Sequence, residues 1–290
     1  MKARTAVPAA RDIQGVRIGM DRDLTPACDI NTNPLCPGSP VYNWYSLETV
    51  QRIGADSFTP DNGVLLAKNK DAETNTCGYT CFTWVVDANP QDIDMVDYYR
   101  PDGTPVKRTI ADYRQLNDAL FHAGTRSGSE YEYVDTANRL HFYVIDRRVG
   151  ADGVLSYTLG CGTWTGPETR YAASRRPPPA APPAARPTGR DLHLRRQQHR
   201  PVRGRRPAHP EDASAYLRAD VYRLSATVAG QGWTVTLPNA LTTAEFGRTV
   251  NVRAVATATS GATQTGRVTL TARSESDPSR TATATCQVAR

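Results

Sequence analysis

The chain has 290 residues, enough for two domains, and its 39% apolar and 22% charged residues are typical of a folded protein. No apolar run approaches the roughly 20 residues that span a bilayer, and the mean hydropathy is −0.52. The net charge of +6 comes from residues 170–209, which carry 11 Arg, one acid and no Lys, a net of +10, so the rest carries −4. This distribution argues against a folded nucleic-acid-binding surface.

Residues 12–165 are predicted to form one strand-rich domain. Two short helices are expected, at Tyr45–Gly54, where Leu47, Val50 and Ile53 form an apolar stripe, and at Thr109–His122. Runs of β-branched and aromatic residues bounded by turn residues predict strands, at Gly63–Ala67, Phe82–Asp87, Tyr131–Val134, Leu140–Ile145 and Val154–Leu159. The fold class expected here is therefore mainly β with two short helices, an α+β domain.

Residues 211–290 have a different sequence pattern from residues 12–165: Thr, Ala, Val and Ser alternate with period 2, and no helical pattern occurs. Strands are expected near Val221–Ala229, Gly232–Leu237, Thr249–Ala258, Gly266–Ala272 and Thr281–Val288. Short strands separated by regular turns predict an immunoglobulin-like β-sandwich, which would ordinarily have about seven strands and so lacks its first two here.

Residues 166–210, between these domains, are rich in Arg, Pro and Ala, a composition that predicts an extended linker. A shift of one nucleotide across Asp191–Arg200, with suitable GC-rich synonymous codons, would instead encode an alternating strand ended by an Asn/Gly turn. It would also supply a cysteine to pair with Cys286. We therefore hypothesise that part of 165–209 is translated out of frame. The N-terminus lacks the apolar region of a signal peptide, and we expect a fragment of a longer reading frame.

The cysteines indicate an oxidising compartment. Two close pairs in polar loop sequence are disulfide candidates, Cys28 with Cys36 and Cys77 with Cys81. Their spacing does not fit the two C-x-x-C knuckles of a zinc ribbon, and the connectivity stays open. Cys161 is interpreted as unpaired or out of frame rather than as a reactive thiol. The protein is therefore expected to be secreted.

Candidate catalytic residues are not found in the sequence, which contains neither H-E-x-x-H nor G-x-S-x-G. His122 and His141 are interpreted as packed or surface residues rather than metal ligands. Four acids in polar loops are weak calcium candidates, with solvated turn carboxylates as the favoured alternative: Asp21, Asp23, Asp92 and Asp94. Seven aromatic residues could form a stacking face for peptides or sugars, although core or cross-strand packing explains them as well: Tyr42, Trp44, Tyr45, Tyr98, Tyr99, Tyr131 and Tyr133.

Several long strings resemble the region after the active site in secreted immune inhibitor A-like zinc metallopeptidases of actinobacteria. They are Asp23–Cys28, Tyr42–Tyr45, Ile53–Gly63, Trp84–Asp92, Tyr99–Gly103 and Phe121–Tyr133. Three more resemble the sandwich that ends many such enzymes, namely Pro210–Tyr216, Leu237–Leu241 and Ser274–Pro278. The resemblance implies a secreted endopeptidase with zinc, and often calcium, in the full-length protein. Because the zinc motif is absent here, no catalytic residue and no cofactor can be assigned to this chain.

The favoured hypothesis is therefore a non-catalytic accessory region. Its partner would be the missing catalytic domain, through which it would meet protein substrates, and neither nucleic acid nor membrane is expected. The alternative is a free-standing extracellular module that binds glycans or cell-wall surfaces. An Arg-rich nucleic-acid binder rests on residues 170–209 alone, where Tyr171 is the one interleaved aromatic, and is disfavoured.

Overall fold

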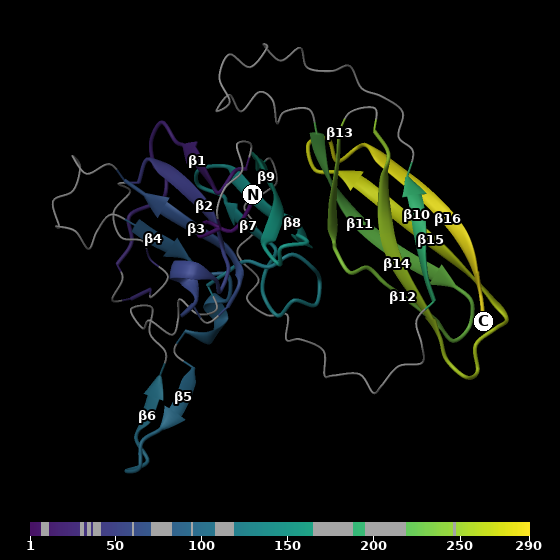
Figure 1. The fold of residues 1–290 in the computed structure, drawn as a ribbon, viewed down its shortest axis with the longest axis horizontal. Helices are drawn as coiled ribbons and strands as arrows, with labels where there is room; N and C mark the ends of the chain where they lie inside the picture. The colour runs from purple at the N-terminus through teal and green to yellow at the C-terminus, as the bar shows by residue number, and fades with distance from the viewer. Residues whose placement is uncertain are drawn as a thin grey trace. The chain divides into compact units, whose positions relative to one another are not determined.

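The computed structural model describes residues 1–6, 12–29, 32–33, 36, 42–59, 61–70, 83–93, 95–107, 119–164, 188–194, 219–245 and 248–290, with the backbone alone at 97 and 188–194. The chain separates into two units (Figure 1). Unit 1 comprises Met1–Ala123 and Ser127–Arg176, and unit 2 comprises Gly124–Arg126 and Pro177–Arg290.

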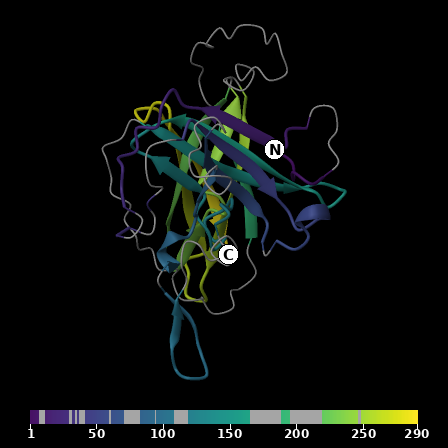
Figure 2. The same cartoon turned by 90° about the vertical axis from the view of Figure 1, so that its left-hand side faces the viewer.

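Unit 1 contains two larger antiparallel sheets and one hairpin, seen in two orientations in Figures 1 and 2. The four-stranded sheet has the order β1-β2-β3-β4, formed by Gly15–Gly19, Trp44–Val50, Gly63–Asn69 and Thr83–Val86. The three-stranded sheet has the order β7-β8-β9, formed by Glu132–Asp135, Leu140–Val149 and Leu155–Thr163. The hairpin pairs β5, Val96–Tyr99, with β6, Pro105–Lys107, and extends away from both sheets.

The core of unit 1 lies between its two larger sheets. Successive side chains of a strand point to opposite faces, so every second residue of β2, β3 and β8 enters this layer. The buried members are Tyr45, Leu47, Val64, Leu66, Val86, Ala88, Phe121, Phe142, Val144, Leu155 and Tyr157. The rings of Tyr45 and Phe142, one from each sheet, have centroids 4.7 Å apart.

The prediction of two short helices is wrong, because the described chain is almost entirely β, with 3₁₀ turns at Gly54–Asp56 (η1) and Pro90–Asp92 (η4). Residues 44–50 form β2, in which Tyr45, Leu47 and Thr49 are buried in strict alternation. Residues 109–118 of the second expected helix lie outside the described residues. Its end is extended, and Phe121 forms an antiparallel bridge with Val64. No helix among the described ranges is long and apolar enough to cross a membrane.

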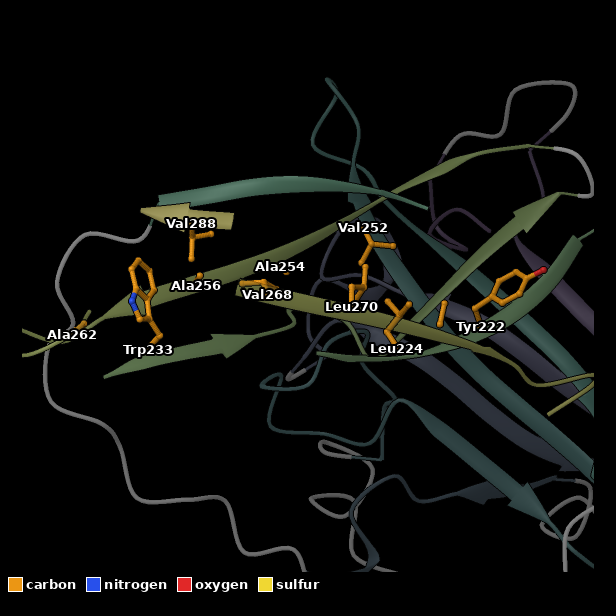
Figure 3. Packing of buried hydrophobic residues seen from close by; sticks show 11 residues of the cluster. Tyr222, Leu224, Trp233, Val252, Ala254, Ala256, Ala262, Val268, Leu270 and Val288 are labelled. Carbon is orange, nitrogen blue, oxygen red and sulfur yellow. The ribbon is translucent and has the colours of Figure 1, made fainter. Parts of the chain in front are cut away.

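Unit 2 consists of two antiparallel sheets packed face to face (Figure 3). One has the order β13-β11-β15-β16, formed by Leu241–Glu245, Ala219–Ala229, Thr265–Ser274 and Thr281–Ala289. The other has the order β10-β14-β12, formed by Thr188–Leu194, Val250–Ala258 and Trp233–Thr236. Both sheets contribute to the core, which includes Leu224, Trp233, Val252, Val268 and Leu270.

Most strands expected from the sequence are present. All five strands of unit 2 predicted from alternation correspond to β11, β12, β14, β15 and β16. Two strands were not expected: β13, and β10, which lies in the stretch interpreted as a linker and pairs with β14 over Thr188–Leu194. In unit 1 the predicted hairpin is β7–β8, whereas β1 and the β5–β6 pairing were not expected.

Candidate functional site

A buried ion pair lies at the end of the four-stranded sheet of unit 1. Lys68, on β3, places its Nζ 3.2 Å from Oδ2 of Asp135, the last residue of β7, and the side chains are only 4% and 5% exposed. The same oxygen accepts hydrogen bonds from the Tyr45 hydroxyl and from Nδ2 of Asn138. The Asn138 amide N–H donates to Oδ1. The carboxylate is therefore held by a cation and three hydrogen-bond donors.

The pKa values of this group follow from burial, the Lys68 charge and the hydrogen bonds to the carboxylate. Burial alone would raise the pKa of Asp135, but the Lys68 charge and the hydrogen bonds to the carboxylate outweigh it and hold that pKa below its usual range. The pKa of Tyr45 is raised, mainly by burial. Both groups thus keep fixed protonation states near neutral pH, unlike a general acid or base, whose pKa should lie near the operating pH.

This ion pair also anchors the loop that contains the calcium candidate Asp23. Nζ of Lys68 donates to Oγ1 of Thr25 at 3.0 Å. Oδ1 of Asp23 accepts hydrogen bonds from Nδ2 of Asn138, at 3.0 Å, and from the Thr25 amide. The role visible for Asp23 is therefore to fasten the 23–25 loop to the β7–β8 turn.

A second polar chain lies on the face of β8 opposite the core. Nε2 of His141 is 2.9 Å from Oε2 of Glu132, and its Nδ1 is 2.7 Å from the Tyr143 hydroxyl. Trp164 packs edge-on against the His141 ring, with centroids 5.3 Å apart. The order carboxylate–imidazole–hydroxyl resembles a catalytic relay, but His141 and Tyr143 are only 2% and 5% exposed. The visible role of these contacts is to join Glu132 on β7 to the outer face of β8.

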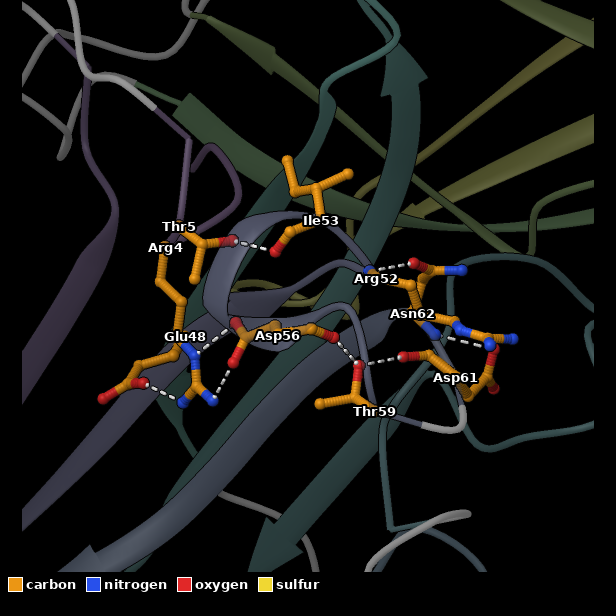
Figure 4. Close-up of polar contacts among 9 residues, drawn as sticks. All are labelled: Arg4, Thr5, Glu48, Arg52, Ile53, Asp56, Thr59, Asp61 and Asn62. Atoms are coloured by element: carbon orange, nitrogen blue, oxygen red, sulfur yellow. Dashed lines mark hydrogen bonds and ion pairs between the residues drawn. The ribbon is translucent and has the colours of Figure 1, made fainter.

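Polar contacts join the β2–β3 loop, residues 51–62, to Arg4 and Thr5 near the N-terminus (Figure 4). Arg4 makes a two-point contact with Asp56, with both N–O distances 2.8 Å, and its third nitrogen is 2.7 Å from Oε2 of Glu48. The hydrogen bonds from Arg4 are the main cause that lowers the pKa of Asp56, against the effect of burial. On the other side of the loop, Nε2 of His122 is 2.8 Å from Oδ2 of Asp61.

The sequence-predicted site residues are not brought together. Cys28 and Cys36 form the disulfide expected for that pair, and Cys77, Cys81 and Asp94 lie outside the described residues. Asp21 is exposed and Asp92 belongs to η4. Cys161 is an exposed residue that forms no disulfide, and partial burial of its thiol raises its pKa to about 11. It therefore lacks the low pKa of a reactive cysteine.

The described donor residues do not form a zinc site. Among the described residues, no group of three or more His, Cys, Asp or Glu could hold a metal ion. The histidines with described side chains, His122 and His141, each face one carboxylate; His141 lies on β8, and His122 lies outside any helix or strand. Zinc in a peptidase needs three protein ligands around an open position, and these residues do not fit it.

The expected aromatic face divides into buried and exposed residues. Tyr42 and Tyr45 are buried, and Trp44 stacks under the guanidinium of Arg17, 4.4 Å from its ring centroid. By contrast, Tyr98 and Tyr99 on the β5–β6 hairpin are 49% and 67% exposed.

The Lys68–Asp135 and Arg4–Asp56 contacts were not predicted from the sequence, because each joins residues far apart in the chain and no local pattern indicates it.

Comparisons with known proteins give two family matches. A family model described as a middle domain matches residues 1–163, more than half of the chain, and one described as a Peptidase M6-like domain matches residues 198–290. The chain is 46% identical over 293 residues to a protein of Arthroderma benhamiae named "Putative secreted metallopeptidase". That match covers 99% of the chain but 42% of the relative, so the chain spans less than half of the relative's length. No solved structure matches the chain.

Proposed function

We propose that this chain, which belongs to a metallopeptidase-like family, is the accessory, non-catalytic region of a longer secreted zinc-dependent endopeptidase. Its finer relation to the immune inhibitor A-like enzymes of actinobacteria is part of the proposal and rests on the sequence resemblance. The matching relative is a fungal protein. In the longer protein, zinc would lie in another domain, and calcium in this chain has no described site to support it.

The observation that carries the proposal is how the polar side chains of unit 1 are used. The ionised and imidazole groups described above are paired with one another, and each of these pairs has at least one buried member, as in Lys68–Asp135, Glu132–His141 and Arg4–Asp56. Groups fixed in this way position strands and loops, and catalysis instead needs groups that converge on an accessible position. The chain therefore supports a scaffold role better than a catalytic one.

The extracellular location predicted from the cysteines is confirmed by the relative, which is named as secreted. The disulfide between Cys28 and Cys36 agrees with it, because such bonds persist in oxidising compartments.

The test is an assay of the purified chain by itself. We expect substoichiometric zinc after dialysis against zinc chloride, and no EDTA-sensitive cleavage of casein. A His122→Gln/His141→Gln variant is the matched control, because it removes both imidazoles with described side chains. Stoichiometric zinc and EDTA-sensitive cleavage in the parent chain, both lost in this variant, would show a catalytic site in unit 1 and refute the proposal.

A second candidate function, a module that binds extracellular glycans, is favoured by one observation. The β5–β6 hairpin exposes Met95, Val96, Tyr98 and Tyr99, which are 42% to 67% accessible. Exposed tyrosine rings are suited to stacking on sugar rings. Retention on insoluble chitin or cellulose that is lost in Tyr98→Ser/Tyr99→Ser would favour this function, and equal behaviour of both proteins would count against it.

A further inference from the structure

The four-stranded sheet of unit 2 carries a regular array of hydroxyl groups on its outer face, over β11, β15 and β16 (Figure 1). Side chains alternate along each strand, so every second residue of these strands points away from the core. The strand register aligns the outward residues in rows across the sheet. One row contains Ser225, Thr271 and Thr283, and the next contains Thr227, Thr269 and Thr285. The six hydroxyls form a grid, with about 4.8 Å between strands and about 7 Å between rows.

The fold itself does not use these hydroxyls. Thr269 and Thr271 are partly buried and the other four residues are exposed. None of the six takes part in a hydrogen bond with another residue that the structure describes. Threonine is common in strands because its β-branched side chain suits them, so the array alone implies no function. Each hydroxyl nevertheless keeps one donor and two acceptor positions for a ligand.

Two arginines stand at the ends of this grid. The outward residues of β15 are, in order, Arg267, Thr269, Thr271 and Arg273, so the two arginine Cα atoms lie about 20 Å apart. Both arginines are exposed, and neither forms an ion pair with a carboxylate of the described residues. The face therefore carries two positive charges that no described carboxylate neutralises.

The acidic residue that follows β15 does not change this charge. Glu275 is bound by Arg223, whose Nε and Nη2 lie 2.9 and 3.1 Å from the two carboxylate oxygens. The Glu275 side chain is only 13% exposed. This ion pair balances its own charges and leaves Arg267 and Arg273 available to an anion.

These features fit a linear ligand that carries both anionic groups and many hydroxyls. A guanidinium binds a carboxylate or a similar oxyanion through two parallel hydrogen bonds, and a threonine hydroxyl can donate to or accept from a sugar hydroxyl. A nucleic acid fits less well, because none of the outward residues of β11, β15 and β16 is aromatic and the bases would find no stacking partner.

We propose that this face, which we call the β15 face, binds an acidic polysaccharide that lies along β15. The face comprises Ser225, Thr227, Arg267, Thr269, Thr271, Arg273, Thr283 and Thr285. The inference does not depend on the accessory role proposed above. It also names a site separate from the β5–β6 hairpin of unit 1.

The test follows the threonine methyl signals of the whole chain by NMR while acidic oligosaccharides are added. Oligogalacturonides supply carboxylates, and heparin oligosaccharides supply sulfates. The signals of Thr269, Thr271 and Thr285 should shift with one common affinity, whereas that of Thr234, exposed on β12 in the other sheet, should not move. A local signal is needed because residues 170–209 carry 11 Arg, which would also bind an anionic resin.

Substitutions of the two arginines identify the anionic contacts. Arg267→Gln and Arg273→Gln should each weaken binding by about tenfold, as expected when a hydrogen-bonded charged group is lost. The double replacement by Lys should keep part of the affinity, because it retains the charge without the planar two-point contact. Arg253→Gln is the matched control, since Arg253 is exposed on β14 and has no ion-pair partner among the described residues. Unchanged thermal unfolding of each variant shows that the fold is intact.

A second pair of substitutions tests the hydroxyls. Thr271→Val/Thr283→Val removes two of them and keeps the β-branched shape of the side chains. The affinity, measured from the Thr269 and Thr285 signals, should fall by at least about threefold, as expected for the loss of neutral hydrogen bonds. An unchanged affinity would contradict a ligand that is recognised through its own hydroxyls.

Other results would also overturn the proposal. They are the absence of methyl shifts with both oligosaccharides, and an equal loss of affinity in Arg253→Gln and in the β15 variants. Equal shifts with neutral cello-oligosaccharides would show that the arginines are not what selects the ligand. Equal binding of single-stranded DNA of matched charge would show a general polyanion surface instead of a polysaccharide site. None of these results affects the zinc and casein assays, which judge the proposed function separately.

Discussion

Removing the buried lysine of unit 1 should be costly. In Lys68→Met the side chain keeps nearly its length, but Asp135 loses the cation that lies 3.2 Å away. At an effective dielectric constant of about 20, this attraction amounts to about 5 kcal/mol before the cost of desolvation. Breaking a buried pair by removing one partner typically destabilises by about 3–5 kcal/mol. Because Asp135 retains three hydrogen bonds, we expect about 3 kcal/mol.

The double variant Lys68→Met/Asp135→Asn separates the charge interaction from the other contacts. It removes both charges, and the side-chain oxygen of the new asparagine can still accept the Tyr45 hydrogen bond. The cost should therefore be less than the sum of the costs of the two single variants, by about 0.5–3 kcal/mol, the range found for residues in direct contact. Unit 2 serves as an internal reference, because its core contains neither Lys68 nor Asp135.

Urea unfolding followed by hydrogen exchange and mass spectrometry measures both units in one sample. A loss of about 3 kcal/mol lowers the midpoint by about 1–1.5 M for a urea m-value of about 2–3 kcal/mol/M. The shift should appear in peptides from β2, β3 and β7, and those from β14 and β15 should keep their midpoint. The reasoning is refuted if Lys68→Met costs under about 1 kcal/mol, or if the two single effects add within about 0.5 kcal/mol.

Two further perturbations test other contacts. Asp56→Asn should make the unfolding free energy of unit 1 depend less on pH in the acid range, because the pKa of Asp56 is lower in the folded chain than in the unfolded chain. The stability that the Asp56 carboxylate contributes is fully present above the unfolded pKa of about 3.9 and is lost as the pH falls through the folded pKa. Acid titration of the unfolding midpoint checks this, and parallel curves for both proteins would contradict it. Gly232→Ala should destabilise unit 2 by about 1–3 kcal/mol. The φ angle of Gly232 is +74°, and a Cβ on this residue would lie 2.8 Å from the Ala262 Cα. Gly261→Ala, where a Cβ meets nothing within 4 Å, is its control, and equal midpoints would refute this account.

The strands could be predicted where one face of a strand is buried and the other is not. In β15 and β16 the alternation of small polar and apolar residues is nearly unbroken, so the period-2 pattern is unambiguous. The helix predicted for residues 45–54 was wrong because this stretch fits two patterns. Leu47, Val50 and Ile53 satisfy a helical spacing, but Tyr45, Leu47 and Thr49 satisfy a strand spacing, and the full burial of Tyr45 and Thr49 shows which one the fold uses. The β-branched Thr49 and Val50 were the available signal.

The strand at 188–194 was missed for a different reason. Its composition, Thr-Gly-Arg-Asp-Leu-His-Leu, lies in an Arg- and Pro-rich stretch, and composition over a long window predicted a linker. What places it in a sheet is pairing with β14, which runs without a break from Thr188 opposite Ala256 to Leu194 opposite Val250. This pairing depends on a strand about 60 residues further along the chain, so the local sequence does not indicate it.

The polar contacts of unit 1 could not be predicted for the same physical reason. Lys68 and Asp135 are separated by 67 positions and Arg4 and Asp56 by 52, so each pair exists only after the sheets have formed. A charge that the fold buries must be paired, because leaving it alone costs several kcal/mol. The pairing in turn fixes the loops that meet there. In this unit the buried charged residues described above therefore hold strands and loops in position.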